Sequence, residues 1–242
     1  MSAATAPTLI EHALTRDLLR GRYAVNSRLP TIRELAELHG VNAATIQRVV
    51  ARLETRGLIT AVQGSGLRVN DPATCGDLSL LPYWLEITLA DPPRAATVLA
   101  DLLEVRRLLA VRLMTRHRTA ILGRAPALKE RVRQLLAAQS GGLEAIRDAD
   151  LAFARDVILA TGNLVALSIF NTTARVVATI PDVAVAMYAD PAENAASMFA
   201  VIAALASDQP DLGDVLDRAL SEVDRRTVAR FEARLTARKA VS

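Results

Sequence analysis

With 242 residues, of which 51% are hydrophobic and only 3% aromatic, the chain has room for one large or two small domains. This composition excludes a disordered protein and favours cores built from Leu, Val, Ile and Ala. The net charge is +3, yet residues 1–70 hold nine basic and five acidic side chains, so the first part of the chain favours a polyanionic partner and the remainder a different one.

The first residues predict a short helix that braces the segment after it. Residues 9–21 form an amphipathic pattern, whose expected inward-facing residues are Leu9, Ala13, Leu14 and Leu18. The start of the chain lacks both the positive residues and the apolar core of a secretory signal peptide. We therefore expect a cytoplasmic protein.

Residues 29–56 predict two helices joined by a tight turn. The first helix starts at a capping box of Thr31 and Glu34, and Gly40 ends it. Asn42 caps the second helix. The residues expected to face inward are Ile32, Leu35, Ala36 and Leu38 on the first helix and Ile46, Val49, Val50 and Leu53 on the second.

A hairpin follows the two helices. Branched residues at 58–62 and 67–69 predict two paired strands around a glycine-rich tip at 63–66. Two helices followed by such a hairpin are the layout of a winged helix-turn-helix, whose second helix enters the major groove of DNA. We expect this DNA-binding domain to occupy residues 1–70.

Side chains on the second helix and around the wing are the candidates for DNA contact, and we expect Asn42, Ala44, Thr45, Gln47 and Arg48 to be exposed. Gln47 can pair with adenine, and Arg48 with guanine or a phosphate. Arg33 can reach a base or the backbone from the first helix. The full set of candidates is Arg22, Arg28, Arg33, Asn42, Ala44, Thr45, Gln47, Arg48, Gln63, Gly64 and Ser65. In this set Arg22 and Arg28 are expected to hold phosphates without reading sequence.

Several of these candidates also have a purely structural interpretation. Asn42 serves as a helix cap whether or not it contacts a base. Arg33 can be a solvated helix residue. The glycines at 64 and 66 can serve only to turn the hairpin.

The remainder of the chain predicts helices alone. Residues 71–77 form the expected linker and contain Cys75, the only cysteine, which excludes an internal disulfide. Helical segments are predicted at about 94–121, 126–139, 143–161, 163–180, 191–206 and 212–238. The longest apolar run, 195–206, is too short to span a bilayer. We therefore expect a mainly α protein, with an all-helical antiparallel bundle over residues 78–242.

The first helix of this bundle has one predicted apolar face. Its residues are Val98, Leu102, Val105, Leu109 and Leu113. Their spacing places all five on one face of a helix.

The segment 29–69 resembles the DNA-binding domain of the GntR family of bacterial transcription regulators. The matching residues are Leu29-Pro30, Arg33-Glu34-Leu35-Ala36, Gly40-Val41, Thr45, Leu53, Gly57-Leu58-Ile59, Gly64, Gly66 and Val69. The helical remainder resembles the FadR-type branch of that family. The resemblance implies a homodimer that binds a palindromic operator, and an effector in the helical domain that alters DNA affinity. Family members commonly carry arginine where this chain has Ala43 and Gln47, so we do not expect the family's usual operator.

The resemblance also bears on a metal site in the helical domain. Many FadR-type domains hold a metal with an aspartate, a histidine four residues later and two further histidines. Here Asp150 occupies the aspartate position, but the histidine position four residues later is Ala154. The positions near Met198 and Ala219, where the two further histidines would be expected, offer no imidazole. A single carboxylate does not hold a transition metal, so we predict no metal.

In lacking the metal ligands the chain resembles the fatty-acid-responsive members of the branch, which implies a long-chain acyl-CoA between apolar helices. The candidate effector-binding residues are Arg106, Asp150, Asn163 and Tyr188. A guanidinium grips a carboxylate or phosphate with two hydrogen bonds, which makes Arg106 the candidate for an anionic group. As structural alternatives, Arg106 is a solvated arginine, Asp150 a buried acceptor, Asn163 a helix cap and Tyr188 a residue that closes the bundle.

The sequence contains no nucleophile elbow, phosphate-binding loop, histidine–carboxylate cluster or paired-cysteine site, so we do not expect an enzyme. The favoured function is a dimeric transcription regulator controlled by a small organic effector. Two alternatives remain. One is a regulator that responds to a small metabolic carboxylate, and the other is a helical ligand carrier whose winged domain has lost DNA binding.

Overall fold

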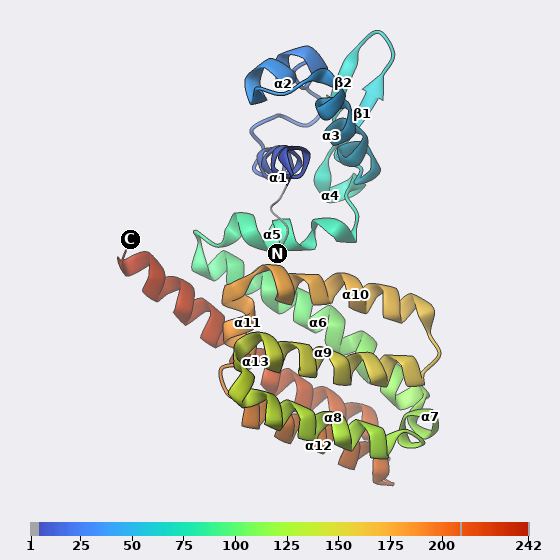
Figure 1. The fold of residues 1–242 in the computed structure, drawn as a ribbon. Helices are drawn as coiled ribbons and strands as arrows, with labels where there is room; N and C mark the ends of the chain where they lie inside the picture. The colour runs from blue at the N-terminus through green and yellow to red at the C-terminus, as the bar shows by residue number, and fades with distance from the viewer. Residues whose placement is uncertain (1–4, 209, 242) are drawn as a thin grey trace. The chain divides into compact units, whose positions relative to one another are not determined.

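The structure, a computed structural model, describes residues 5–208 and 210–241. Its contacts divide the chain into two compact units, one that ends at Ile87 and one that starts at Thr88. Helices and one two-stranded sheet form the regular structure of the described residues (Figure 1). The mainly α fold predicted from the sequence, with a winged helix-turn-helix before a helical domain, is confirmed.

From residue 5 onward, the N-terminal unit contains five helices, a 3-10 turn and the hairpin. In chain order these are α1 (Ala6–Leu19), α2 (Ile32–His39), α3 (Ala43–Thr55), β1 (Ile59–Val62), β2 (Gly66–Val69), α4 (Pro72–Cys75), the turn η1 (Leu78–Leu80) and α5 (Leu81–Thr88). The strands are antiparallel, with Ile59 opposite Val69 and Val62 opposite Gly66. Gly64 turns the tip with a φ of 72°, a left-handed conformation that favours glycine.

The capping residues predicted for the two central helices are confirmed. At the start of α2 the Glu34 amide donates to the Thr31 hydroxyl (3.3 Å), and the Thr31 amide donates to the Glu34 carboxylate (2.7 Å). The Thr31 hydroxyl also donates to the Glu34 carboxylate (2.9 Å), and the two bonds that this carboxylate accepts from Thr31 hold the pKa of Glu34 below its ordinary value. Gly40 ends α2 with a φ of 63°, and Asn42 accepts the Thr45 amide at the start of α3 (2.9 Å). Short-range hydrogen bonds therefore fix the turn between the helices.

The core of the N-terminal unit lies mainly between α1 and α3. It includes Ile10, Leu14, Leu18, Leu35, Ile46, Val49, Val50 and Leu53. Two residues predicted to lie in it do not, since Leu9 is 57% and Leu38 69% exposed. On α1 the buried positions repeat every four residues at Ile10, Leu14 and Leu18. Leu9 therefore lies outside the side of the helix that faces the core. On the short α2, Leu35 and Ala36 already fill the contact with the core.

Residues 78–87 belong to the N-terminal unit, although the sequence placed them in the helical domain. Leu80 and Tyr83 are buried in the first core, and Trp84 and Ile87 pack against it. Residues 71–77, the expected linker, contain α4. The segment that actually joins α5 to the next helix is only Leu89 to Asp91, and the Asp91 amide closes it as a turn by donating to the Thr88 carbonyl (2.8 Å).

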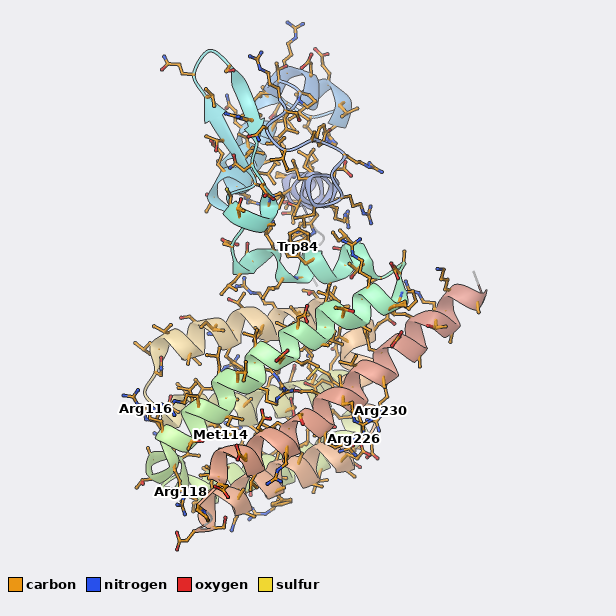
Figure 2. The ribbon with its side chains drawn as sticks, turned by 180° about the vertical axis from the view of Figure 1, so that it is seen from behind. Trp84, Met114, Arg116, Arg118, Arg226 and Arg230 are labelled. Carbon is orange, nitrogen blue, oxygen red and sulfur yellow. The ribbon has the colours of Figure 1, made fainter. Side chains whose placement is uncertain are left out.

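The helical unit is a bundle. Its elements are α6 (Pro92–Arg116), α7 (Arg118–Leu122), α8 (Ala125–Ala137), the 3-10 turn η2 (Ala138–Gly141), α9 (Gly142–Ala160), α10 (Leu164–Thr179), α11 (Pro181–Met187), α12 (Pro191–Ala206) and α13 (Leu212–Val241). The long helices α6 and α13 lie side by side (Figure 2), and α8 packs between α9 and α12. The segment predicted as one helix over 94–121 is divided at His117, whose backbone leaves the helical region.

The apolar face predicted for α6 is not its buried side. Val105 is 56% and Leu109 40% exposed, while Val98, Leu102 and Leu113 are half-buried. The buried residues of this helix are Pro92, Ala95, Ala96, Leu99, Leu103 and Met114. Between Leu103 and Met114 the inner side also carries the paired Arg106 and Arg107, so an apolar stripe did not reveal which side faces the bundle.

Within residues 5–208 and 210–241, no individual helix combines the length and apolarity of a membrane span. The pair α10 and α11 reaches that composition only when both are counted together, and a bend of 100° separates them.

Candidate functional site

The exposed residues of α3 form the centre of the candidate DNA interface. Asn42, Ala44, Gln47 and Arg48 are exposed, as the sequence predicted. Thr45 is not, because only 6% of it is accessible and its hydroxyl accepts a hydrogen bond from Arg48 (3.3 Å). The expectation of an exposed Thr45 is therefore wrong, since the position lies on the buried side of the first turn of α3.

Arg33 extends from the first turn of α2 with 89% of its side chain exposed. Its Nε donates to Glu37 one turn later (3.1 Å). An exposed ion pair between residues four apart contributes at most a few tenths of a kcal/mol, so a phosphate can replace Glu37 at little cost. Arg33 is thus free to change partner.

The wing is held to the body of the unit by Arg28. The Arg28 guanidinium donates to the Ser65 hydroxyl at the wing tip (3.0 Å), and the Arg28 backbone forms an isolated bridge with Arg68 of β2. Gln63 and Gly64 are exposed at the tip. Arg22 is also exposed and pairs with Asp17 (3.0 Å). Of the two predicted phosphate-binding arginines, Arg28 therefore also positions the wing.

Sequence reasoning missed Arg68 as a further exposed cation on the wing. It lies on β2 between the buried Leu67 and Val69, opposite Thr60 on β1. The alternation of apolar and polar residues along this short strand is the signal that places its side chain outward.

In the helical unit, Arg106, Asp150 and Tyr188 form a second candidate site. The Tyr188 hydroxyl donates to Asp150 (3.0 Å). Burial raises the pKa of Asp150, while the Tyr188 hydroxyl and the positive charge of Arg106 act in the opposite direction. Three of the four predicted effector residues therefore interact with one another, although they come from α6, α9 and the end of α11.

Asn163 has a different role. Its side-chain oxygen accepts the Ala166 amide (3.0 Å) and caps α10. This is the structural alternative that the sequence offered for it.

The side chain of Arg106 is held by a charge network centred on the buried Asp224, which the sequence did not reveal. Asp224 accepts a hydrogen bond from Arg106 (2.7 Å) and another from Arg107 (3.0 Å), and Asp217 accepts one from Arg107 (2.9 Å). The Arg106 Nε is buried and has no hydrogen-bond partner among the residues that the structure describes. The sequence signal was the spacing of Asp217 and Asp224, seven residues apart and hence on one side of α13.

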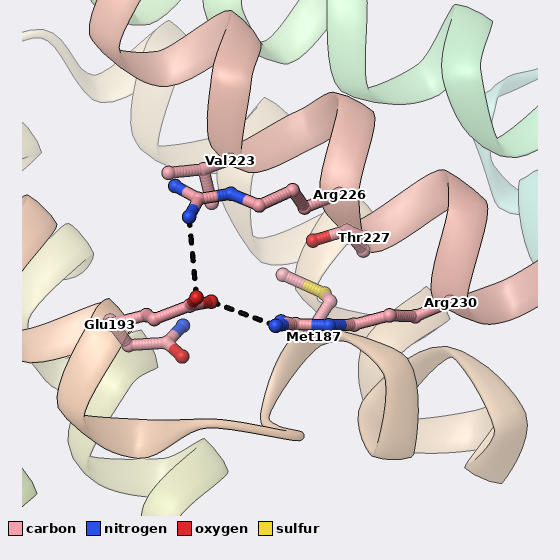
Figure 3. A pocket seen from close by; sticks show the side chains of 7 residues that line it. Met187, Glu193, Val223, Arg226, Thr227 and Arg230 are labelled. Carbon is pink, nitrogen blue, oxygen red and sulfur yellow. Dashed lines mark hydrogen bonds and ion pairs between the residues drawn. The ribbon is translucent and has the colours of Figure 1, made fainter.

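The pocket in Figure 3 lies between α12, α13 and the end of α11. It is lined by Met187, Glu193, Asn194, Val223, Arg226, Thr227 and Arg230. Its two arginines converge on one carboxylate, since Glu193 accepts from Arg226 (3.2 Å) and from Arg230 (2.9 Å). None of the four predicted effector residues lines this pocket.

The histidine, cysteine, aspartate and glutamate side chains within the described ranges form no group of three or more that could hold a metal ion.

The raised pKa of Asp150 gives a pH-dependent prediction. Because the folded state holds the proton more tightly than the unfolded state, this group contributes stability at acidic pH that is lost as the pH rises through the raised pKa. Asp150→Asn removes that loss, so its unfolding free energy should improve relative to the wild type as the pH rises from the ordinary range of aspartate to neutrality. Chemical denaturation at several pH values measures the difference.

Tyr188→Phe is the control for this prediction. It removes the hydroxyl that stabilises the Asp150 carboxylate, so its stability should fall more steeply with rising pH than that of the wild type. Parallel pH profiles for the wild type and Asp150→Asn would contradict the assignment.

Comparisons with known proteins identify a family for the first part of the chain. The family model of bacterial regulatory proteins, gntR family, matches residues 8–69. A fatty acid metabolism regulator protein of Vibrio cholerae serotype O1 is 31% identical over 96 residues, which make up 40% of this chain and 33% of that protein. An uncharacterized HTH-type transcriptional regulator of Mycobacterium tuberculosis is 44% identical over 55 residues, or 23% of each chain.

The chain therefore aligns with about a third of the length of the first of these relatives. One solved structure, described as "Lar controls the expression of the Listeria monocytogenes agr system and mediates virulence", is similar over 96% of this chain and 98% of its own, with a TM-score of 0.56 and 16% identity. At that identity the likeness concerns the fold alone.

Proposed function

Since residues 8–69 form a helix-turn-helix domain of the gntR family of bacterial regulatory proteins, we propose that the protein is a cytoplasmic transcription regulator that binds an operator as a homodimer. The exposed start of α3, flanked by Arg33 and the wing, is the observation that carries this proposal. Two such units in a symmetric dimer present their α3 helices to successive major grooves. No catalytic activity is proposed.

We further propose that the helical unit binds a small organic effector that changes operator affinity. The half-buried Arg106, whose buried Nε lacks a partner in the described chain, supports an anionic ligand. The resemblance to fatty acid metabolism regulators favours a long-chain acyl-CoA over a small metabolic carboxylate, which is the second candidate. Both ligands offer an anionic group to a guanidinium.

The proposed function is tested by measuring affinity for DNA fragments from upstream of the protein's own gene as a function of salt. A regulator that contacts phosphates should lose affinity with a log–log slope of about −0.9 per phosphate contacted. Long-chain acyl-CoA should raise the melting temperature and shift that affinity. If acyl-CoA changes neither quantity, the fatty-acid version fails and the regulator stands. Absence of DNA binding would favour the ligand carrier.

Arg33→Ala should reduce operator affinity by about tenfold or more, because a guanidinium that contacts a base or a phosphate contributes about 1–3 kcal/mol. Fluorescence anisotropy with a labelled operator measures this loss. Arg133→Ala is the matched control, since Arg133 is also an exposed arginine of a helix and pairs with Glu130 one turn away, but it lies in the helical unit. Equal affinities of the Arg33 variant and the wild type would remove Arg33 from the interface.

A further inference from the structure

The outer side of α6 carries an apolar stripe in the middle of a helix of 25 residues. Val105 is 56%, Leu108 57% and Leu109 40% exposed. These residues are three and four positions apart, so they are neighbours on one side of the helix. Single exposed apolar residues are ordinary, but a contiguous stripe of them on one side of a helix marks an interaction surface.

Two charges of opposite sign flank this stripe at equal spacing. Asp101 lies one turn before Val105, and Arg112 lies one turn after Leu108. Both side chains are exposed, and neither forms an ion pair within residues 5–208 and 210–241. The positions 101, 105, 108 and 112 fall on one side of a helix. The side of α6 formed by Asp101, Val105, Leu108, Leu109 and Arg112 is called the α6 face below.

We propose that two copies of the chain associate through their α6 faces, with the two helices antiparallel about a two-fold axis midway between Val105 and Leu108. In an isologous contact, if residue i of one copy contacts residue j of the other, residue j of the first copy also contacts residue i of the second. The antiparallel arrangement therefore sets Asp101 of each copy against Arg112 of the other, so that one interface contains the attraction twice. Val105, Leu108 and Leu109 of both copies are removed from water at its centre, inside the charged rim.

The charges also argue against other occupants of the α6 face. A nucleic acid or an anionic lipid surface favours cations alone, whereas this side of α6 presents acids toward its start and bases toward its end, since the exposed Glu104 and Arg116 lie beside Asp101 and Arg112. A parallel pairing of two copies would set Asp101 against Asp101. Only an antiparallel second copy satisfies both charges and covers the stripe.

Charge exchange in the full-length chain tests this inference, with the oligomeric state measured by sedimentation equilibrium. Asp101→Arg and Arg112→Asp should each weaken the dimer by on the order of tenfold or more, because each creates two like-charge contacts per interface. The double variant restores opposite charges and should dimerise like the wild type. An equimolar mixture of the two single variants should form heterodimers that neither forms alone.

Leu108→Glu should likewise weaken the dimer, and Leu164→Glu is its matched control. Leu164 is 75% exposed at the start of α10, outside the α6 face, so its replacement should leave the dimer unchanged. Circular dichroism identifies any variant that fails to fold, and the rescue in the double charge variant does not depend on the leucine variants.

The inference specifies the surface of the homodimer in the proposed function, and the two can fail separately. Dimers that persist unchanged in both single charge variants would overturn the α6 face and leave the regulator intact. A wild-type chain that is monomeric at every concentration would overturn both the α6 face and the proposed dimer. Loss of operator binding with an intact α6-face dimer would overturn only the regulator.

Discussion

Asp224→Ala is expected to destabilise the helical unit by about 3 kcal/mol, because removing one partner of a buried ion pair leaves the other charge uncompensated. Asp224 is only 6% exposed and accepts hydrogen bonds from both Arg106 and Arg107. Without it, Arg107 keeps only Asp217, and Arg106 loses the carboxylate to which it donates. Water that reaches Arg106, whose side chain is 39% exposed, keeps the loss at the lower end of the range for buried pairs.

Urea denaturation followed by far-UV circular dichroism measures this loss. Asp217→Ala is the control, since Asp217 is 44% exposed and accepts only from Arg107. Its replacement should cost no more than about 1 kcal/mol. Equal losses for the two variants would mean that the burial of Asp224 has no energetic consequence.

Leu53→Ala is expected to cost the N-terminal unit about 2–5 kcal/mol, the usual range for truncating a fully buried leucine. Leu53 has no exposed surface and lies in the core between α1 and α3. Trp84, the only tryptophan, packs against the same core, so its fluorescence reports the unfolding of this unit. Operator affinity should fall with the fraction of folded N-terminal unit.

Leu38→Ala is the matched control for Leu53→Ala. Leu38 is 69% exposed on α2, so the same truncation there should change the unfolding free energy by no more than about 0.5 kcal/mol. A large loss of unfolding free energy for Leu38→Ala would mean that Leu38 packs against a partner that a single chain does not contain.

The elements that could be predicted from sequence are those fixed by short-range hydrogen bonds. Thr31 with Glu34, Gly40 and Asn42 set the ends of α2 and α3 through contacts within four residues of each other. Such contacts depend on few neighbours, so the residue types and their spacing suffice to place them. The helix-turn-helix follows from them.

The sides of the helices were harder to predict, because the apolar residues do not all face the core. On α6 the stripe from Val98 to Leu113 matches a buried pattern, but the bundle instead receives Leu99, Leu103 and the paired arginines. Arg106 and Arg107 face α13 because acidic partners there compensate their charge, and those partners lie more than a hundred residues away in sequence. A local pattern contains no information on such a pair.

The candidate site in the bundle was predicted in part for the same reason. Arg106, Asp150 and Tyr188 were identified from the family resemblance, and they do interact. Asn163, which directly follows Gly162, is the N-cap of α10, a position where asparagine is common. Asp224 completes the network only through the tertiary packing of α6 on α13.

The short connection between α5 and α6 limits the freedom of a dimer built on this chain. Three residues reach at most about 10 Å when extended, and here they are folded into a turn whose Asp91 also caps α6. In the proposed dimer, so short a connection would limit how far each DNA-reading domain can move from its own helical unit. The proposed regulator should therefore discriminate among operators by the rotational phasing of their half-sites, and tolerate insertions between them poorly.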